Sequence, residues 1–362
     1  MPPATRSHDI FPAICTGQIS TEVLQSFLKQ MPQTVALVAQ GDFSVLLTDK
    51  ADDFSKLGSI QVLSEYALYN YDAVTRLVHT ATQATGIKKT AFILLDRATA
   101  DDGVSCCIAI DAREDDESAP LFGFRCEFGS IEPALKAIEQ GVPVKELRDQ
   151  SVMAGGLWRK YVVERRLTRS SSLNMSDFFP AHKDWRPTFT DDVSLHFPVF
   201  RTAEVSIKTL NNFLEQAYDH EWGPLADPRV AFITKLDAPF TDGLAEAPLA
   251  SAPELLEMLY GAKPSECDAV VRSRFWDDSL DPKLDRHRFI IMDEFTETDR
   301  SVITAVNFQN EGRLIISRAD FKLAVLNLMA PGTTGLCAED IASSATRSGL
   351  GVERWKTPGR HG

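Results

Sequence analysis

The feature that most constrains this chain is an internal repeat, because two copies of one segment are expected to fold in the same way. The segment that starts at Phe11 reads FPAICTGQISTEVLQSFLKQ, and the segment that starts at Phe197 reads FPVFRTAEVSIKTLNNFLEQ. Eight of the twenty positions are identical. Unrelated segments of average composition agree at roughly one position in sixteen, so this match favours a shared origin for the two halves.

Further matched blocks follow in the same order in both halves of the chain. They are VALV at 35–38 and VAFI at 230–233, DAVTR at 72–76 and DAVVR at 268–272, and FILLD at 92–96 and FIIMD at 289–293. Two amphipathic segments, 130–140 and 320–330, close the series. Co-linear order favours a duplication, and the alternative is two unrelated α/β domains that share generic patterns.

Each copy predicts the same succession of strands and helices. A strand-like entry leads to a helix that Ser20 or Ser206 caps, and an apolar strand follows. A second helix is expected to be capped by Asp72 or Asp268, and a buried strand, a hairpin and a final helix complete the unit. The predicted fold class is therefore α/β (or α+β), with two tandem copies of a mixed-sheet unit, helices packed on the sheet, and a pseudo-twofold arrangement.

The same patterns predict four parts along the chain. A first α/β unit spans residues 1–141, and a second spans residues 195–336. Between them, residues 142–194 form a connector with a helix at 144–153, a basic helix, and a segment rich in aromatic residues and proline. Residues 337–362 are expected to form a C-terminal helix and a disordered tail, and two glycines and Trp355 in this part mirror part of the connector.

Charge and cysteine content limit the partners of the protein. The formal net charge of −13 disfavours binding to nucleic acid and to anionic membranes. No run approaches the roughly 18 apolar residues of a membrane helix, and the first residues contain no apolar leader. The spacing of the six cysteines fits neither a disulfide framework nor a zinc site. We expect reduced thiols, a cytoplasmic location, and a small molecule or a protein as partner.

Two aspartates at the ends of buried strands are the first candidate site residues. Ligands in open α/β sheets gather at the carboxyl ends of strands, where Asp96 and Asp293 stand. Asp293 is a candidate catalytic carboxylate together with His220, which lies in a loop dense in ionisable groups, and Asp96 is a candidate ligand-binding residue. The alternative is that both aspartates are turn or cap residues.

Aromatic and basic residues of the connector are the other candidates for ligand binding. They are Trp158, His182, Trp185 and Arg186. Aromatic rings beside cationic groups can line a ligand site or bind an acidic partner. The alternative is that the tryptophans dock on a neighbouring domain.

Common motifs of cofactor-dependent enzymes are absent from the sequence. It contains no GxxxxGK[ST], no GxGxxG after a strand, no GxSxG, no HExxH and no CxxC. We therefore expect no cofactor and no metal.

The order of a buried strand ending in Asp, a hairpin and a closing helix resembles an uncharacterised α/β domain of filamentous fungi and some actinobacteria. The blocks Phe92–Asp96 and Phe289–Asp293 carry this resemblance. It implies a context, secondary-metabolite biosynthesis, and no particular reaction. We expect a small-molecule-binding or accessory protein. The alternatives are a cofactor-free isomerase, cyclase or hydrolase acting in a cleft between the units, and a protein-interaction module.

Overall fold

The structure is a computed structural model, and it divides the chain into two compact units. It describes residues 10–38, 46–47, 88, 91–110, 122–168, 196–218, 230–236, 245, 247–274, 284–308 and 313–333. The main part of the first unit ends at Val163, and the second unit follows from Glu164. In the described part of the chain, no helix is long and apolar enough to cross a membrane.

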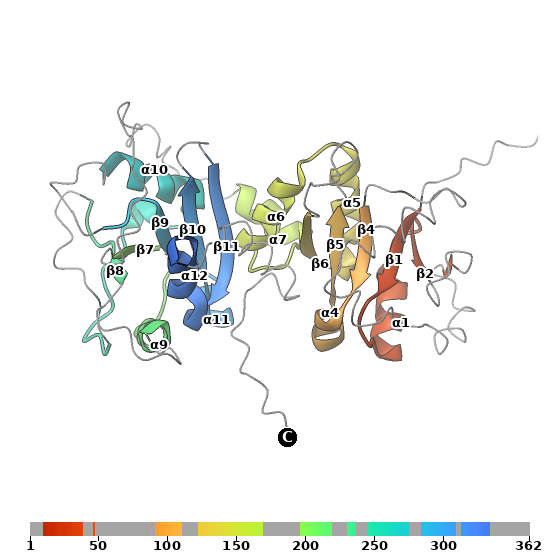
Figure 1. The fold of residues 1–362 in the computed structure, drawn as a ribbon, viewed down its shortest axis with the longest axis horizontal. Coiled ribbons are helices and arrows are strands. Elements are labelled where there is room, and N and C mark those ends of the chain that lie inside the picture. The colour runs from red at the N-terminus through yellow and green to blue at the C-terminus, as the bar shows by residue number, and fades with distance from the viewer. Residues whose placement is uncertain are drawn as a thin grey trace, which may run out of the picture. The chain divides into compact units, whose positions relative to one another are not determined.

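The first unit is built on a six-stranded mixed sheet in the order β3-β2-β1-β4-β5-β6. The three strands β2, β1 and β4 are parallel, and the others run antiparallel to their neighbours. The strands are β1 (Phe11–Cys15), β2 (Val35–Val38), β3 (Leu46–Leu47), β4 (Ala91–Leu95), β5 (Ser105–Ile110) and β6 (Phe122–Glu127). The helices are α1 (Thr21–Gln30), α4 (Arg97–Asp102), α5 (Ile131–Glu139), α6 (Val144–Met153) and α7 (Lys160–Thr168), which begins where the unit ends (Figure 1).

The second unit is built on a five-stranded mixed sheet in the order β11-β10-β9-β7-β8. Here β8, β7 and β9 are parallel, while β10 runs antiparallel to both of its neighbours. The strands are β7 (Phe197–Arg201), β8 (Val230–Phe232), β9 (Arg288–Met292), β10 (Ser301–Phe308) and β11 (Arg313–Asp320). The helices are α9 (Ile207–Tyr218), α10 (Pro264–Arg274), α11 (Thr296–Asp299) and α12 (Phe321–Thr333).

The two sheets share their strand order and also their pairing register. Strands β7, β8, β9, β10 and β11 correspond to β1, β2, β4, β5 and β6. Ala13 lies opposite Ile93, and their counterparts Val199 and Ile290 also lie opposite each other. A one-residue slip would turn every side chain to the other face of the sheet. The common register therefore confirms the prediction of two tandem copies of one mixed-sheet unit.

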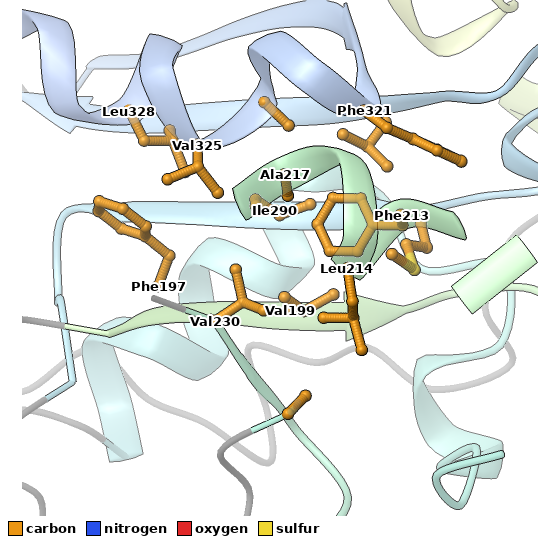
Figure 2. Close-up of a cluster of buried hydrophobic side chains, with 14 of the residues drawn as sticks. Phe197, Val199, Phe213, Leu214, Ala217, Val230, Ile290, Phe321, Val325 and Leu328 are labelled. Atoms are coloured by element: carbon orange, nitrogen blue, oxygen red, sulfur yellow. The ribbon is translucent and has the colours of Figure 1, made fainter. Parts of the chain in front are cut away.

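One face of the second sheet carries the core of that unit. Phe213 and Leu214 of α9 and Val325 and Leu328 of α12 belong to one cluster of buried apolar side chains, which Figure 2 shows. The rings of Phe213 and Phe321 pack edge to face at 5.4 Å. In the first unit, Phe27 and Phe128 repeat this pair at 5.3 Å. The spacing of apolar residues in both first helices thus buries equivalent rings.

Helix α10 differs from its predicted form because it begins earlier than expected. Pro264 takes the first helical position, and Glu266 accepts a hydrogen bond from the Lys263 N–H at 2.6 Å. Asp268 therefore lies inside the helix, where it pairs with Arg272 one turn on. The prediction that Asp268 caps this helix is wrong, because proline and glutamate provide the earlier start. The matching residue Asp72 lies outside the described residues.

The edge strand of the first sheet is covered by residues that the sequence assigned to the connector. Trp158 pairs with Cys126 in a parallel bridge. The Trp158 N–H donates to Arg125 O at 2.9 Å, and the Glu127 N–H donates to Trp158 O at 3.2 Å. Helix α6 has the predicted bounds and packs against β6. This cover satisfies backbone groups that a bare edge strand would leave without partners.

Candidate functional site

Asp96 directly follows β4, and it accepts hydrogen bonds from a buried arginine of β6. Arg125 donates from Nη1 to both carboxylate oxygens of Asp96, at 2.8 and 2.9 Å. Its Nη2 donates to Ser105 Oγ at 2.6 Å. Thr99 and Asp96 also exchange backbone-to-side-chain hydrogen bonds of 3.0 and 3.2 Å, so Asp96 caps α4.

Asp293 occupies the equivalent place after β9, and the same residue types surround it. Arg318 of β11 donates to both oxygens of Asp293, on Oδ1 at 3.3 Å, and to Ser301 Oγ at 3.1 Å. The Asp293 N–H donates to Thr296 Oγ1 at 3.0 Å. We call these two sets of aspartate, threonine, serine and arginine the Asp–Arg clusters.

The Asp–Arg clusters hold their carboxylates as ion-pair partners. Arg125 and Arg318 are 1% and 0% exposed, and each guanidinium is compensated by its aspartate, with Asp102 as a second ion-pair partner of Arg125 at 3.8 Å. Each pair joins the end of a central strand to the last strand of the same sheet. Both oxygens of Asp293 are bound by Arg318, which fits a structural role better than that of a catalytic base.

Sequence reasoning found the aspartates of these clusters and missed their partners. A signal was present in both copies as Asp-x-x-Thr followed by Ser and then Arg. The members stand at 96, 99, 105 and 125 in the first unit and at 293, 296, 301 and 318 in the second. The arginines lie 29 and 25 residues beyond the aspartates, so only the strand pairing shows that they meet.

Of the connector residues predicted to bind a ligand, only Trp158 lies in the described part of the chain. Its indole Nε1–H donates to Gln150 Oε1 at 3.0 Å, and its ring packs against Phe124. This placement gives Trp158 a structural task at the edge of the first sheet. The candidates His182, Trp185, Arg186 and His220 lie outside the described residues.

Another buried arginine, Arg201, lies at the carboxyl end of β7. Sequence reasoning did not identify it as a candidate. Arg201 is 7% exposed. Its Nη1 donates to Pro253 O, its Nη2 donates to Val205 O at 3.4 Å, and its Nε has no acceptor. Burial lowers the pKa of Arg201, and the negative charge of Glu204 opposes this effect.

This end of β7 is the point at which the chain changes direction across the sheet. From β7, the chain passes through α9 to β8 on one side and later returns to β9 on the other side. Ligands of open α/β sheets bind at the carboxyl ends of strands at such a switch point. Thr202 bridges the two sides, since its N–H donates to Met292 O at 2.8 Å and its carbonyl accepts from Gly261 N–H at 2.7 Å.

The equivalent end of β1 in the first unit carries no arginine. Cys15 replaces Arg201, and Gly17 replaces Ala203. A Cβ on Gly17 would meet Arg97 N and Asp96 C at 2.7 Å, closer than real Cβ atoms come. The loop after β1 therefore lies directly on the end of β4. Ala203 carries a Cβ at the equivalent position, although the preceding Thr202 N–H donates to Met292 O at 2.8 Å as the Thr16 N–H donates to Leu95 O at 2.8 Å.

The amino end of α9 beside this place already holds a carboxylate of the chain. Ser206 donates to Glu297 from its N–H at 2.9 Å and from its Oγ at 2.8 Å. These two hydrogen bonds lower the pKa of Glu297 against a small opposing effect of burial. Positive peptide dipoles at a helix start favour such an anion. We call Arg201, Thr202, Ala203 and Ser206 the carboxyl-edge site.

A different polar network lies at the amino end of β9 in the same unit. Asp268 binds Arg272 through one oxygen and Asn307 through the other. The Asn307 N–H donates to His287 O at 2.7 Å, and the His287 N–H donates to Asp285 at 2.8 Å. Burial raises the pKa of Asp268, and Arg272 and Asn307 oppose this shift. Since both oxygens have partners, we interpret this network as structural.

The described cysteines are free and buried. Burial raises the pKa of Cys15 and of Cys107 to about 12, and it also raises the pKa of Cys106, Cys126 and Cys267. Such thiols are poor nucleophiles near neutral pH. Within the described ranges, no three metal-ligating side chains come together.

No family model matches the chain, and no curated protein and no solved structure matches it either.

Proposed function

We propose that this protein binds a small molecule and that its second unit carries the binding site, at the carboxyl-edge site. The observation that carries the proposal is the difference between two equivalent places. In the first unit, Gly17 brings the loop onto the end of β4, and Cys15 is buried and apolar. In the second unit, Ala203 stands in place of Gly17, and a buried charge, Arg201, stands in place of Cys15.

Because the protein is duplicated, comparison of the two copies separates residues that stabilise the common fold from residues that are candidates for ligand binding. Features that both copies retain, such as the Asp–Arg clusters, support the common fold. A charged group that only one copy carries at a switch point has no counterpart in that common fold. Buried charges reduce stability unless they are compensated. The presence of Arg201 at the carboxyl end of β7 therefore supports a binding role at this end of the sheet.

The test is retention of ligand by the purified full-length chain. The protein would be incubated with a defined mixture of water-soluble metabolites, separated from free compounds by gel filtration, and analysed by native mass spectrometry. We expect one mass adduct per chain. In Ala203→Trp, a large ring fills the corner next to β7, and the adduct should fall at least about tenfold, since each 1.4 kcal/mol of lost binding is a factor of ten.

The matched control is Val104→Trp, which adds the same ring at an exposed position of the first unit. It should retain the adduct at the level of the unmodified protein. Thermal unfolding of each variant checks that both are folded. Equal retention by Ala203→Trp and by the unmodified protein would place the ligand elsewhere, and the absence of any adduct would contradict a binding function.

A further inference from the structure

Arg201 differs from three other buried arginines, Arg125, Arg288 and Arg318, in its charge compensation. Arg125, Arg288 and Arg318 are each 6% exposed or less, and each forms an ion pair with an aspartate. Arg201 is buried to a similar extent, yet it bonds only to two backbone carbonyls. Among the described residues, no ion pair joins its guanidinium to a carboxylate, and only the charge of Glu204 acts on it from a longer distance. Its charge is therefore buried without an ion-pair partner in the described part of the chain.

A buried cation without a counterion is energetically unfavourable for the protein alone. Carbonyl dipoles offset part of the lost hydration, but a buried ion still lowers stability unless a counterion compensates its charge. The Nε–H of Arg201 also lacks an acceptor, as do the Nε–H groups of Arg125 and Arg272, and an unmet buried donor lowers stability further. An anion that accepts from Nε and compensates the charge would remove both costs.

The surroundings of Arg201 also favour an anion. Val205, whose carbonyl accepts from Nη2, directly precedes Ser206 at the start of α9. The positive end of the helix dipole thus lies next to a cation, and both favour negative charge at this end of β7. Glu297 accepts a hydrogen bond from the Ser206 N–H, and the positive charge of Lys208 also lowers the pKa of Glu297. The exposed Glu204 is the carboxylate that acts on Arg201 at longer range.

We infer that the ligand of the carboxyl-edge site is a small oxyanion, a carboxylate or a phosphate, bound by the guanidinium of Arg201. The inference rests on the proposed function, because it specifies the ligand class of the same site. Arginine suits this task because its planar fork of donors matches the oxygens of carboxylates and phosphates. The equivalent Cys15 cannot provide such a charge, so binding is assigned to the second unit alone.

The experiment compares anions and neutral analogues at constant ionic strength. Thermal unfolding of the full chain would be measured with 10 mM glucose 6-phosphate or glucose, and with 10 mM benzoate or benzamide. We expect a rise in Tm of about 2–4 °C with at least one anion, corresponding to a ligand present in about tenfold excess over Kd. The neutral analogues should give no rise.

Two variants separate specific binding from general effects of salts on stability. Arg201→Gln should lose the shift, whereas Arg300→Gln, which removes the same charge from an exposed position, should keep it. Because Arg201→Gln removes two hydrogen bonds and could impair folding, Arg201→Lys provides a second comparison. It keeps the charge without the planar fork, and its shift should be reduced to half or less. In NMR spectra, the Arg201 Nε–H resonance should move on addition of the anion.

The outcomes distinguish the inference from the proposed function. A shift retained in Arg201→Gln would overturn the inference, since Arg201 would then not be the binding group. A native-mass adduct with a neutral compound, together with no response to any anion, would leave the proposed function standing and reject the anion class. No adduct and no response to any compound would reject both.

Discussion

Buried charges among the described residues include three arrangements that differ in energetic consequence. In the Asp–Arg clusters, an arginine and an aspartate compensate each other, and a neighbouring serine hydroxyl accepts a further hydrogen bond from the guanidinium. At Arg201, a cation is buried with carbonyl partners only. At Asp149 of α6, one carboxylate oxygen is buried without a hydrogen-bond partner. Each arrangement predicts a distinct response to substitution.

Removal of one partner from an Asp–Arg cluster should strongly destabilise the second unit. In Arg318→Met, the carboxylate of Asp293 remains buried without compensation, and we expect a loss of about 3–5 kcal/mol in the free energy of unfolding. The double variant Asp293→Leu with Arg318→Met should recover part of this loss. Urea unfolding measures both. Lys136→Met, which breaks an exposed pair, should cost less than about 1 kcal/mol, and an equal cost there would contradict the argument.

Asp149 should make stability depend on pH in the range where it titrates. Burial raises its pKa to about 6, although Arg148 and Lys145 oppose the shift. The folded state therefore holds the proton more tightly than the unfolded state, so this contribution to stability is complete near pH 4 and is lost as pH rises through 6.

Asp149→Asn should abolish this pH dependence. We expect the variant to be more stable than the unmodified protein by about 1–2 kcal/mol at pH 8, allowing for partial exposure, and equally stable at pH 4. Chemical unfolding at the two pH values measures the difference. Asp101→Asn removes the same charge from an exposed position, and a similar gain there would show that net charge is responsible.

At the scale of elements, the two copies keep the same strands and differ in the loops that follow them. Strands β1 and β7 have the same register with their neighbours on both sides. The loops that leave these strands differ in sequence, since Gly17 lies against the backbone at the end of β4, where a Cβ would not fit, while Ala203 stands at the equivalent position. The tolerance for a side chain at this position is therefore expected to differ between the two copies.

The two loops should respond in opposite ways to exchange of glycine and alanine. Gly17→Ala places a Cβ 2.7 Å from backbone atoms, so we expect a loss of more than about 2 kcal/mol in the stability of the first unit. Ala203→Gly removes one methyl group and should cost about 1 kcal/mol. Thermal unfolding of both variants tests this pair. Similar costs for the two variants would contradict the difference in loop geometry.

At the scale of the whole molecule, each unit has its own sheet and its own buried core. Phe27 belongs to the core of the first unit and Phe213 to that of the second, and both are fully buried. A unit of this size can bury enough apolar surface to be stable on its own account. The duplication therefore gives one chain two cores with the same aromatic pair.

Substitution of the equivalent phenylalanines should affect different steps of unfolding. Phe27→Ala should lower the stability of the first unit by about 3–5 kcal/mol, and Phe213→Ala should lower that of the second unit by a similar amount. Differential scanning calorimetry should show two transitions, and each variant should shift a different one. A single transition that both variants shift together would show that the units unfold as one.

The sequence by itself determined the repeat, the fold class and the position of most strands. Strands such as Phe92–Asp96 were predictable because a continuous apolar run between polar turns is a local pattern. The strand itself spans Ala91–Leu95, and Asp96 follows as the cap of α4. The alternative expectation, that this aspartate caps a helix, therefore holds for Asp96.

Only the tertiary structure decided what each polar group meets. Arg125 and Asp96 are 29 residues apart, and they meet because β4, β5 and β6 pair in one register. The sequence around Arg201 likewise contains no local pattern that predicts a buried arginine without an ion-pair partner. Hydrophobic patterns repeat with the period of a helix or strand and are visible in sequence, whereas charge compensation depends on neighbours that folding brings together from distant positions.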